Sequence, residues 1–450
     1  MFQRNIQQDL VQWLHSKPRK PMVLRGARQV GKTTAVHTFA KQFEQYLYFN
    51  LELAEDKEVF QGFRDIDTLL QALFFLRNKT QRKLDKTLLF IDEIQEMPEV
   101  MNILRYFYEQ VPALAVIAAG SLLEILFNPK ASFPVGRVEY RVIRPVSFPE
   151  FLGAMGEDAS LQQLKQVPLA DFAHEKLLRL FHTYALLGGM PEVVQHYAGS
   201  RDLATLAPVY ESLIAAYLDD VEKYATHPSQ IQYIRHAIRS VFTEAGHRIK
   251  FQGFGQSNYG SREMGEALRT LEKALLIHLV FPQTKATLPL LPDYRKSPRL
   301  QVLDTGIMNY SLGIQKEIIK TVDLDQVYQG TLIEHLVGQE LLAVRSNVLS
   351  GLHFWVREKK TSQAEVDFLH PYEQQLIPLE VKSGAEGKLR SLHLFMDLAP
   401  HTTAVRFYAG PLRITTAETP KGKQYQLLSL PYYLVSQLDA YLDWLKEKAQ

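Results

Sequence analysis

A glycine-rich segment near the N-terminus has the residue types and the spacing of a phosphate-binding loop. Residues 26–33 read GARQVGKT and match the pattern G-x-x-x-x-G-K-[ST]. Glycines let backbone N–H groups curve around phosphates, Lys32 can reach the β- and γ-phosphates, and the Thr33 hydroxyl can ligate Mg²⁺. A chance match is disfavoured because an apolar strand pattern precedes the segment and a helical pattern follows it. The residues predicted to surround the nucleotide are Gly26, Ala27, Arg28, Gln29, Val30, Gly31, Lys32, Thr33 and Thr34.

An acidic pair further along the chain can supply the rest of an ATP site. Residues 87–91 (TLLFI) form a continuous apolar run, and Asp92 and Glu93 follow directly. We expect Asp92 to hold Mg²⁺ through water and Glu93 to polarise the attacking water. Such a pair is by itself a common start of a polar loop, so its weight comes from the phosphate loop upstream. Together the two motifs predict ATP binding and hydrolysis with Mg²⁺ as cofactor.

Three acidic residues and a lysine form a second candidate site near the C-terminus. Glu380 and Lys382 lie two residues apart in a strand pattern, so their side chains point to the same face. Asp367 precedes them by one predicted hairpin, and Glu334 lies in the helical pattern of residues 330–345. The carboxylates are candidate ligands of a second Mg²⁺ or of Mn²⁺, and Lys382 can orient water or stabilise a pentavalent phosphate.

The order of these four residues resembles the PD-(D/E)XK nuclease fold, with Glu on a helix, Asp on a strand and E-x-K on the next strand. The E-x-K string alone is weak evidence, because residues 55–57, 358–360 and 386–388 repeat it in polar stretches. The proline of the motif name is replaced by Val366, at a position that varies in that fold. The resemblance implies metal-dependent nucleic-acid cleavage. The alternative is a domain that keeps this fold for binding, with its carboxylates in salt bridges.

The chain as a whole resembles a bacterial and archaeal family of AAA+ ATPases in which the ATPase module is fused to a C-terminal domain of long-unassigned function. The resemblance covers nearly the whole chain. It depends on the strings GARQVGKTT (26–34), LLFIDEIQ (88–95), AAGS (118–121), RPVSFPEFL (144–152), GGMPE (188–192) and LDTG (303–306).

This resemblance implies roles for two further residues. Ser121 stands where the first sensor residue contacts the γ-phosphate, although a serine there can equally be an ordinary helix N-cap. Arg137 is the candidate for an arginine finger that acts on a neighbouring subunit of a homo-oligomer. The alternative for Arg137 is a surface salt bridge.

The elements that must position these residues divide the chain into four parts. Strand and helix patterns alternate over residues 1–150, which predicts an α/β fold with a parallel-sheet ATPase core. Residues 151–240 are predicted to form a helical lid. Residues 241–324 are predicted to form a winged-helix-like region with a linker, and residues 325–450 the α/β nuclease-like domain.

Basic residues in the third part make DNA a candidate partner. A winged helix uses a basic helix and wing to grip phosphates, and a lid or protein-contact module is the equal alternative. The basic residues are Arg248, Lys250, Arg262, Arg269, Arg295, Lys296 and Arg299.

Composition narrows the classes of function. The 450-residue chain has no cysteine, which excludes disulfides, thiol catalysis and Cys-ligated zinc. Its net charge of +2 gives no global attraction to nucleic acid or acidic membranes. The sequence shows no signal peptide and no apolar run that would span a bilayer, so we expect a cytoplasmic protein without membrane partners.

Three functions compete at this stage. An ATP-driven enzyme acting on DNA explains both candidate sites. A nucleotide-dependent switch or scaffold explains the ATP site with a C-terminal domain that only binds a partner. A metabolite kinase fits the Asp-Glu pair and the large appended domains poorly.

Overall fold

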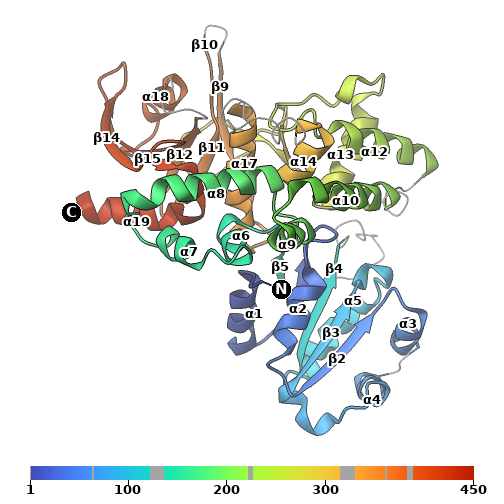
Figure 1. Ribbon diagram of the computed structural model, residues 1–450. Helices are drawn as coiled ribbons and strands as arrows, with labels where there is room; N and C mark the ends of the chain where they lie inside the picture. The colour runs from blue at the N-terminus through green and yellow to red at the C-terminus, as the bar shows by residue number, and fades with distance from the viewer. Residues whose placement is uncertain are drawn as a thin grey trace.

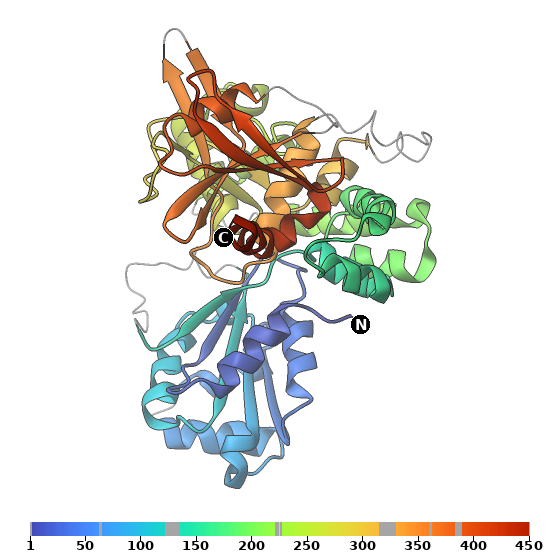
Figure 2. The same ribbon diagram turned by 90° about the vertical axis from the view of Figure 1, so that its left-hand side faces the viewer.

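The computed structural model describes residues 2–62, 65–121, 136–220, 225, 227–314, 330–359, 362–382 and 389–449. A parallel sheet built from the first third of the chain lies at one end of the molecule, and the middle and C-terminal segments lie together at the other (Figures 1 and 2). In the part of the chain that is described, no helix has the length and apolar character needed to cross a bilayer.

The N-terminal sheet has five parallel strands in the order β2-β3-β4-β1-β5. Alternate strand residues bury opposite faces, so helices pack on both sides of the sheet. The strands are β1 (Met22–Arg25), β2 (Gln45–Asn50), β3 (Thr87–Asp92), β4 (Ala115–Gly120) and β5 (Glu139–Val142). The helices are α1 (Ile6–His15), α2 (Lys32–Ala40), α3 (Ala54–Phe60), α4 (Ile66–Leu76) and α5 (Val100–Gln110).

This arrangement confirms the predicted α/β core with a parallel sheet. Two of its elements were not predicted, the short helix α3 and the edge strand β5. Strand β5 reads EYRV, and only its last residue is buried. A polar edge strand of this kind has no apolar run by which to recognise it.

The next segment is helical, as its sequence predicts. In Figure 1 the first four of its helices lie between the N-terminal sheet and the C-terminal sheets, and the last two lie beside α13 and α14. They are α6 (Phe148–Ala154), α7 (Asp158–Leu164), α8 (His174–Leu187), α9 (Pro191–Ser200), α10 (Ala207–Asp219) and α12 (Pro228–Ser240).

Beyond α12, the predicted helix and strand of the winged-helix-like region are present as α13 (Ser261–Lys273) and β6 (Ile277–Val280). Strand β6 pairs antiparallel with β8 (Arg299–Val302), and α14 (Thr305–Ser311) follows. The segment between the two strands is more than a wing or linker, because β7 (Pro282–Gln283) pairs in parallel with β9 of the C-terminal segment. The winged-helix assignment therefore stays a prediction.

The C-terminal segment contains a long helix and two sheets. The sheets have the strand orders β10-β9-β7 and β11-β12-β13-β15-β14. The helices are α17 (Gly330–Ala343), α18 (Arg390–Met396) and α19 (Leu438–Ala449). The strands are β9 (Phe354–Lys359), β10 (Ser362–Val366), β11 (Phe368–Tyr372), β12 (Gln375–Val381), β13 (Thr403–Tyr408), β14 (Arg413–Glu418) and β15 (Gln424–Pro431).

The apolar pattern of residues 365–370 predicts a single strand, and this prediction is wrong. The structure has two strands there, β10 and β11, which belong to different sheets and meet at Asp367. The physical reason is that Val366 and Phe368 pack into two different hydrophobic clusters, so the chain must turn between them. The sequence pattern of residues 387–397 predicts a helix; residues 387–388 lie outside the described part of the chain, and α18 begins at Arg390.

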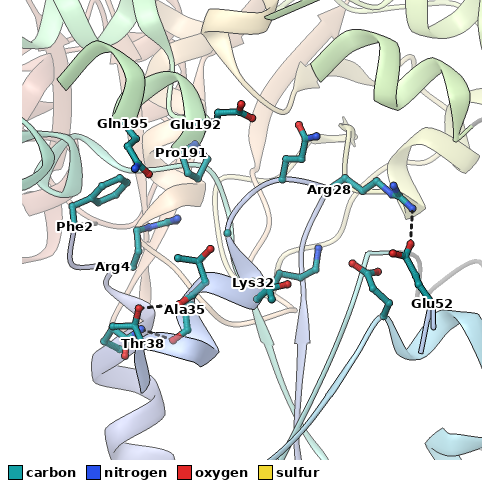
Figure 3. Close-up of a pocket in the computed structure, with 16 residues that line it drawn as sticks. Phe2, Arg4, Arg28, Lys32, Ala35, Thr38, Glu52, Pro191, Glu192 and Gln195 are labelled. Atoms are coloured by element: carbon teal, nitrogen blue, oxygen red, sulfur yellow. Dashed lines mark hydrogen bonds and ion pairs between the residues drawn. The ribbon is translucent and has the colours of Figure 1, made fainter. Parts of the chain in front are cut away.

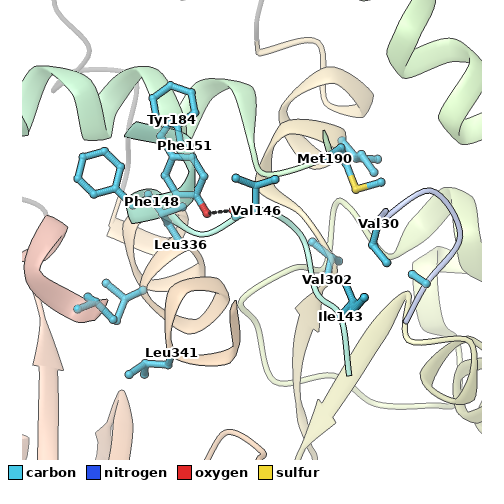
Figure 4. Packing of buried hydrophobic residues seen from close by; sticks show 14 of the residues in the cluster. Val30, Ile143, Val146, Phe148, Phe151, Tyr184, Met190, Val302, Leu336 and Leu341 are labelled. Atoms are coloured by element: carbon cyan, nitrogen blue, oxygen red, sulfur yellow. Dashed lines mark hydrogen bonds between the residues drawn. The ribbon is translucent and has the colours of Figure 1, made fainter. Parts of the chain in front are cut away.

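Helix α17 joins the C-terminal segment to the ATPase core and the lid. A continuous apolar core runs from Val30 in the phosphate loop to Leu336 on this helix (Figure 4). The Glu340 carboxylate accepts the Phe148 N–H at 3.0 and 3.1 Å and the Tyr184 hydroxyl at 2.5 Å. Burial raises the pKa of Glu340 to about 7. The same helix carries Glu334, so it extends from the ATPase core to the second candidate site.

Candidate nucleotide site and carboxylate cluster

The phosphate loop runs from the end of β1 to the start of α2, as its motif requires. Gly31 has φ +91°, in the left-handed region that favours glycine. A Cβ atom on Gly26 would lie 2.4 Å from the Ile143 carbonyl oxygen, so no larger residue fits there. The loop therefore needs its two glycines for different reasons, one for backbone conformation and one for close packing.

Lys32 lies in the centre of this loop and is 6% exposed. Its ammonium group donates to the carbonyl oxygens of Gly26 and Ala27, both at 3.0 Å. Burial lowers the pKa of Lys32, and the charges of Glu93 and Asp92 oppose that effect. The ammonium group is thus placed where it can meet phosphate oxygens.

Thr33 and Asp92 meet although they lie far apart in the sequence. The Thr33 hydroxyl donates to Asp92 Oδ2 at 2.7 Å, and the Glu93 N–H donates to Asp92 Oδ1 at 3.0 Å. Burial raises the pKa of Asp92 to about 6. A hydroxyl and a carboxylate in contact beside a phosphate loop are suited to a hydrated Mg²⁺.

Glu93 has a backbone conformation that is unusual for its type, with φ +51°. Residues other than glycine rarely occupy this region, and such strain is concentrated at functional sites. The Gln95 side chain donates to the Glu93 carboxylate, which faces the cavity. Glu93 is therefore in a position to act on water beside a bound nucleotide.

A cavity of about 430 Å³ opens over the loop (Figure 3). Part of its wall comes from residues that were not predicted to belong to the site. Arg4 donates to the carbonyl oxygens of Val30 at 3.0 Å and Arg144 at 2.6 Å, so the N-terminal segment braces the phosphate loop. The other lining residues that were not predicted are Phe2, Gln7, Ala35, Thr38, Glu52, Pro191, Glu192 and Gln195.

Arg28 lines the cavity and also connects the loop to helix α10. Its guanidinium forms an ion pair with Asp220, just past the end of α10. It also lies 3.7 Å from Glu52 (Figure 3). The Tyr217 hydroxyl also donates to the Arg28 carbonyl oxygen at 3.2 Å. The loop and the lid helix α10 are thus in direct contact.

The two residues implied by the AAA+ resemblance lie near the same sheet. Ser121 is buried at the end of β4, and its hydroxyl has no hydrogen-bond partner in the described part of the chain. The alternative of a helix N-cap concerns residues 122–135, which lie outside that part. The Arg137 side chain is 45% exposed and forms an ion pair with Glu109 at 3.2 Å. Both assigned roles stay predictions.

The second candidate site is a cluster of carboxylates and cations, hereafter the carboxylate cluster. Its members are Glu334, Asp367, Glu380, Lys382 and Arg299. The Lys382 ammonium lies 2.5 Å from Glu380, and Asp367 Oδ2 accepts the Val381 N–H at 2.6 Å. The first four of these residues are the ones that the sequence predicts to form one site.

Arg299 is the member that the sequence analysis did not assign to this cluster. Its side chain is 5% exposed, and it donates to the Glu334 carboxylate and to the Asp367 carbonyl oxygen. The rings of Phe354 and Phe368 lie 4.6 and 4.7 Å from its guanidinium carbon. A fixed cation from β8 therefore neutralises part of the cluster.

The acids of the cluster are held close together away from water. Burial raises the pKa of Glu334 to about 8, with Asp367 and Glu365 adding to the rise and Arg299 opposing it. Burial and the neighbouring Asp367 also raise the pKa of Glu380 to about 8. The cluster thus contains three carboxylic acids but two cations, so the cations cannot neutralise all three acids when these are ionised.

A metal ion at this cluster would find few preformed ligands. In the described ranges, no group of three or more histidine, aspartate or glutamate side chains is arranged to hold one. Glu380 Oε2, however, is buried and has no hydrogen-bond partner among these residues. The cluster therefore offers one unused buried acceptor oxygen but lacks a three-ligand site.

Most of the basic residues predicted to contact DNA are already paired with acids. Arg248 and Lys296 both contact Glu358, and Arg299 contacts Glu334. The remaining ion pairs are Arg262–Glu266 and Arg295–Asp293. The expected patch is therefore smaller than its sequence indicates.

Three known families match successive parts of the chain. Residues 18–152 match the family described as AAA domain. Residues 178–318 and 329–433 match two families described as domains of unknown function, DUF8612 and DUF4143. No curated protein matches the chain.

Several solved structures are similar in part. The Orc1 protein of Aeropyrum pernix in complex with DNA is 14% identical, with a TM-score of 0.27 over 70% of this chain and 92% of its own. The Pif1 helicase of Candida albicans is 13% identical, with a TM-score of 0.23 over 40% of this chain and 48% of its own. A STAND protein with a tetratricopeptide repeat sensor from Pyrococcus horikoshii is 12% identical, with a TM-score of 0.28 over 76% of this chain and 48% of its own. TM-scores this low carry no argument about this chain.

The AAA domain match includes both halves of the nucleotide site. It spans the phosphate loop and the Asp92–Glu93 pair, and it thereby confirms the AAA part of the resemblance. The nuclease-like part stays a prediction, because residues 329–433 match a family without an assigned function. Residues 18–152 thus match the AAA domain family and carry the phosphate loop and the Asp92–Glu93 pair.

Proposed function

We propose that this chain binds and hydrolyses ATP and uses the ATPase cycle to act on nucleic acid. The observation that carries the ATPase half is the 2.7 Å contact of the Thr33 hydroxyl with Asp92 beside the buried Lys32. Lys32 and Thr33 lie at the start of α2 and Asp92 at the end of β3, and this arrangement is suited to binding phosphates and Mg²⁺. The preference for nucleic acid is supported by the carboxylate cluster, which has the residue types used in phosphodiester chemistry.

The residues of the nucleotide site have separate proposed roles in binding and hydrolysis. Backbone N–H groups of the loop and Lys32 hold the phosphates, and Glu93 orients and polarises the attacking water. Bound Mg²⁺ would neutralise charge on the phosphates, held by Thr33 and, through water, by Asp92. Arg137, exposed on the surface, is proposed to complete the site of a neighbouring copy in a homo-oligomer.

Replacing Glu93 with glutamine separates binding from hydrolysis. We expect Glu93→Gln to retain ATP and to hydrolyse it at least about 10²-fold more slowly, because an amide cannot accept a proton from water. Fluorescent-nucleotide binding and phosphate release measure the two properties. Glu96→Gln changes a nearby carboxylate outside the cavity and should hydrolyse ATP at the wild-type rate. Equal rates in Glu93→Gln and wild type would remove the proposed role of Glu93.

A second activity, metal-dependent cleavage of nucleic acid at the carboxylate cluster, is favoured by Glu380. Its Oε2 atom is a buried acceptor without a partner in the described residues, next to Lys382 and Asp367. Asp367 and Glu380 would hold the ion, with Glu334 nearby, and Lys382 would orient water. Bound Mg²⁺ or Mn²⁺ would supply Lewis-acid activation of the phosphodiester.

Metal binding at the cluster should depend on pH. The pKa of Glu380 is raised to about 8, so its carboxylate becomes available as the pH rises through that value. We expect Mn²⁺ binding, measured by titration calorimetry, to be tighter at pH 8.5 than at pH 6.5. Glu380→Gln should lose this binding and any cleavage of a DNA and RNA panel. Glu373→Gln, at an exposed glutamate paired with Lys446, is the matched control. Wild-type binding by Glu380→Gln would exclude the cluster as a metal site.

The alternative of a nucleotide-dependent switch or scaffold is favoured by a different observation. Arg299 already pairs with Glu334 inside the cluster, as expected of a domain that binds without cleaving. Slow turnover with tightly retained nucleotide supports the switch, whereas fast turnover that nucleic acid accelerates supports the proposed enzyme.

A further inference from the structure

A groove outside both sites lies between α13 and the turn that precedes β8. Its volume is about 590 Å³, and its principal walls are Lys250, Phe251, Arg269, Phe281, Tyr294 and Lys296. We refer to it as the Tyr294 groove. Neither the ATPase chemistry nor the carboxylate cluster accounts for these residues.

The Tyr294 groove is strongly basic. Among the described residues that line it, four carry a positive charge (Lys250, Arg269, Arg295 and Lys296) and one, Glu272, a negative charge. A Glu272 oxygen is engaged by the Leu279 N–H at 2.9 Å. Lys250 and Arg269 have no carboxylate partner in the described part of the chain, whereas Arg295 and Lys296 do. An anionic ligand would therefore meet two cations, Lys250 and Arg269, that no described carboxylate pairs with.

The same groove presents an aromatic surface to solvent. Tyr294 is 72% exposed, and its ring centroid lies 4.9 Å from that of Phe281. Phe251 lies beneath the Arg269 guanidinium, 5.8 Å from the ring centroid. A large exposed ring supported by a second ring can stack on a flat ligand, and the cations beside it can hold that ligand's charge.

We propose that the Tyr294 groove binds a single strand of nucleic acid, with a base stacked on Tyr294 and phosphates at Lys250 and Arg269. This inference rests on the proposed action on nucleic acid and names the form of the substrate. Aromatic stacking beside a positive groove is the usual way in which proteins hold an unpaired strand, whereas bases inside a duplex have no free face to offer. An acidic peptide would use the cations but would leave the exposed ring without a role.

The position of the groove suits this substrate. Its wall residue Ile249 donates its N–H to the Pro298 carbonyl oxygen at 2.9 Å, directly before Arg299 of the carboxylate cluster. Lys296 reaches Glu358 on β9, the strand that pairs with β10 and so leads to Asp367. A strand held in the groove would therefore lie next to the cluster.

Fluorescence anisotropy of a labelled oligothymidylate, without ATP or divalent metal, tests the proposal on the full chain. We expect Tyr294→Ala to weaken binding about tenfold, and Tyr294→Trp, which keeps a stacking ring, to retain it. The double variant Lys250→Ala/Arg269→Ala should lower the slope of log affinity against log salt by about 1.4, because each lost phosphate contact accounts for about 0.7. Lys273→Ala is the matched control. Lys273 is an exposed lysine at the end of the same helix, does not line the groove, and its replacement should change affinity less than about twofold.

Three results would overturn the proposal. They are an affinity for a duplex of the same length equal to that for the single strand, competition by polyglutamate equal to that by unlabelled oligothymidylate, and equal losses of affinity in Tyr294→Ala and Lys273→Ala. Because the assay contains no ATP, its outcome is independent of ATP hydrolysis. Failure of the groove and failure of the ATPase proposal are therefore distinguishable.

Discussion

Replacing Lys32 with alanine should reduce ATP hydrolysis by about 10²- to 10³-fold. The Lys32 ammonium lies in the centre of the phosphate loop and is held there by two carbonyl oxygens at 3.0 Å. It is the cation placed to meet the β- and γ-phosphates, and a buried, prepositioned charge costs no reorganisation at the moment of reaction. Alanine removes both the binding and the stabilisation, so phosphate release should fall close to background.

Lys41→Ala is the matched control, because Lys41 is an exposed lysine just past the end of the same helix, α2. It should hydrolyse ATP at the wild-type rate. Thermal unfolding of both variants checks that they are folded. If folded Lys32→Ala released phosphate as fast as Lys41→Ala, the phosphate loop would not be the site of hydrolysis.

The nucleotide site could be predicted because its functional residues lie in short, contiguous stretches of the sequence. The phosphate loop occupies eight successive residues, and Asp92 and Glu93 follow an apolar strand directly. Parallel strands end at the same edge of a sheet, so the two strings meet once the sheet forms. The contact of Thr33 with Asp92 is the expected result of that topology.

Residues that join a site from elsewhere could not be predicted in this way. Arg4 reaches the phosphate loop from before α1, and Arg299 reaches Glu334 because β8 and α17 are neighbours. Neither arginine has a periodicity or motif that distinguishes it from a surface cation. The sequence instead predicts Arg299 to belong to a basic wing. Its burial could not be predicted, because that burial depends on packing between elements that are distant in the sequence.

A close backbone junction joins the helical segment at the end of α8 to the segment at the start of α14, and residues of the GGMPE (188–192) and LDTG (303–306) strings form it. Gly188 and Gly189 follow α8, and the buried Asp304 precedes α14. Asp304 accepts the Gly189 N–H at 2.5 Å and the Ile307 N–H at 3.0 Å. Gly306 completes the junction on the other side, packed against the end of α8.

Gly306→Ala should lower the free energy of unfolding by about 3 kcal/mol. A Cβ atom at this position would lie 1.9 Å from the Leu187 carbonyl oxygen and 2.9 Å from the Gly188 nitrogen. Both are backbone atoms, so no side-chain rotation can relieve the overlap. The ends of α8 and α14 must instead separate, which strains the hydrogen bonds of Asp304. Urea unfolding followed by circular dichroism measures the change as a lower midpoint.

Gly199→Ala is the matched control for this substitution. Gly199 lies in α9, and a Cβ atom there meets nothing within 4 Å. Alanine favours a helix over glycine by up to about 1 kcal/mol, so this variant should be as stable as the wild type or slightly more so. The opposite signs of the two effects separate a steric cause from a general intolerance of glycine substitution. Equal midpoints for the two variants would mean that the backbone at Gly306 can move apart freely, and that the junction does not hold the lid in place.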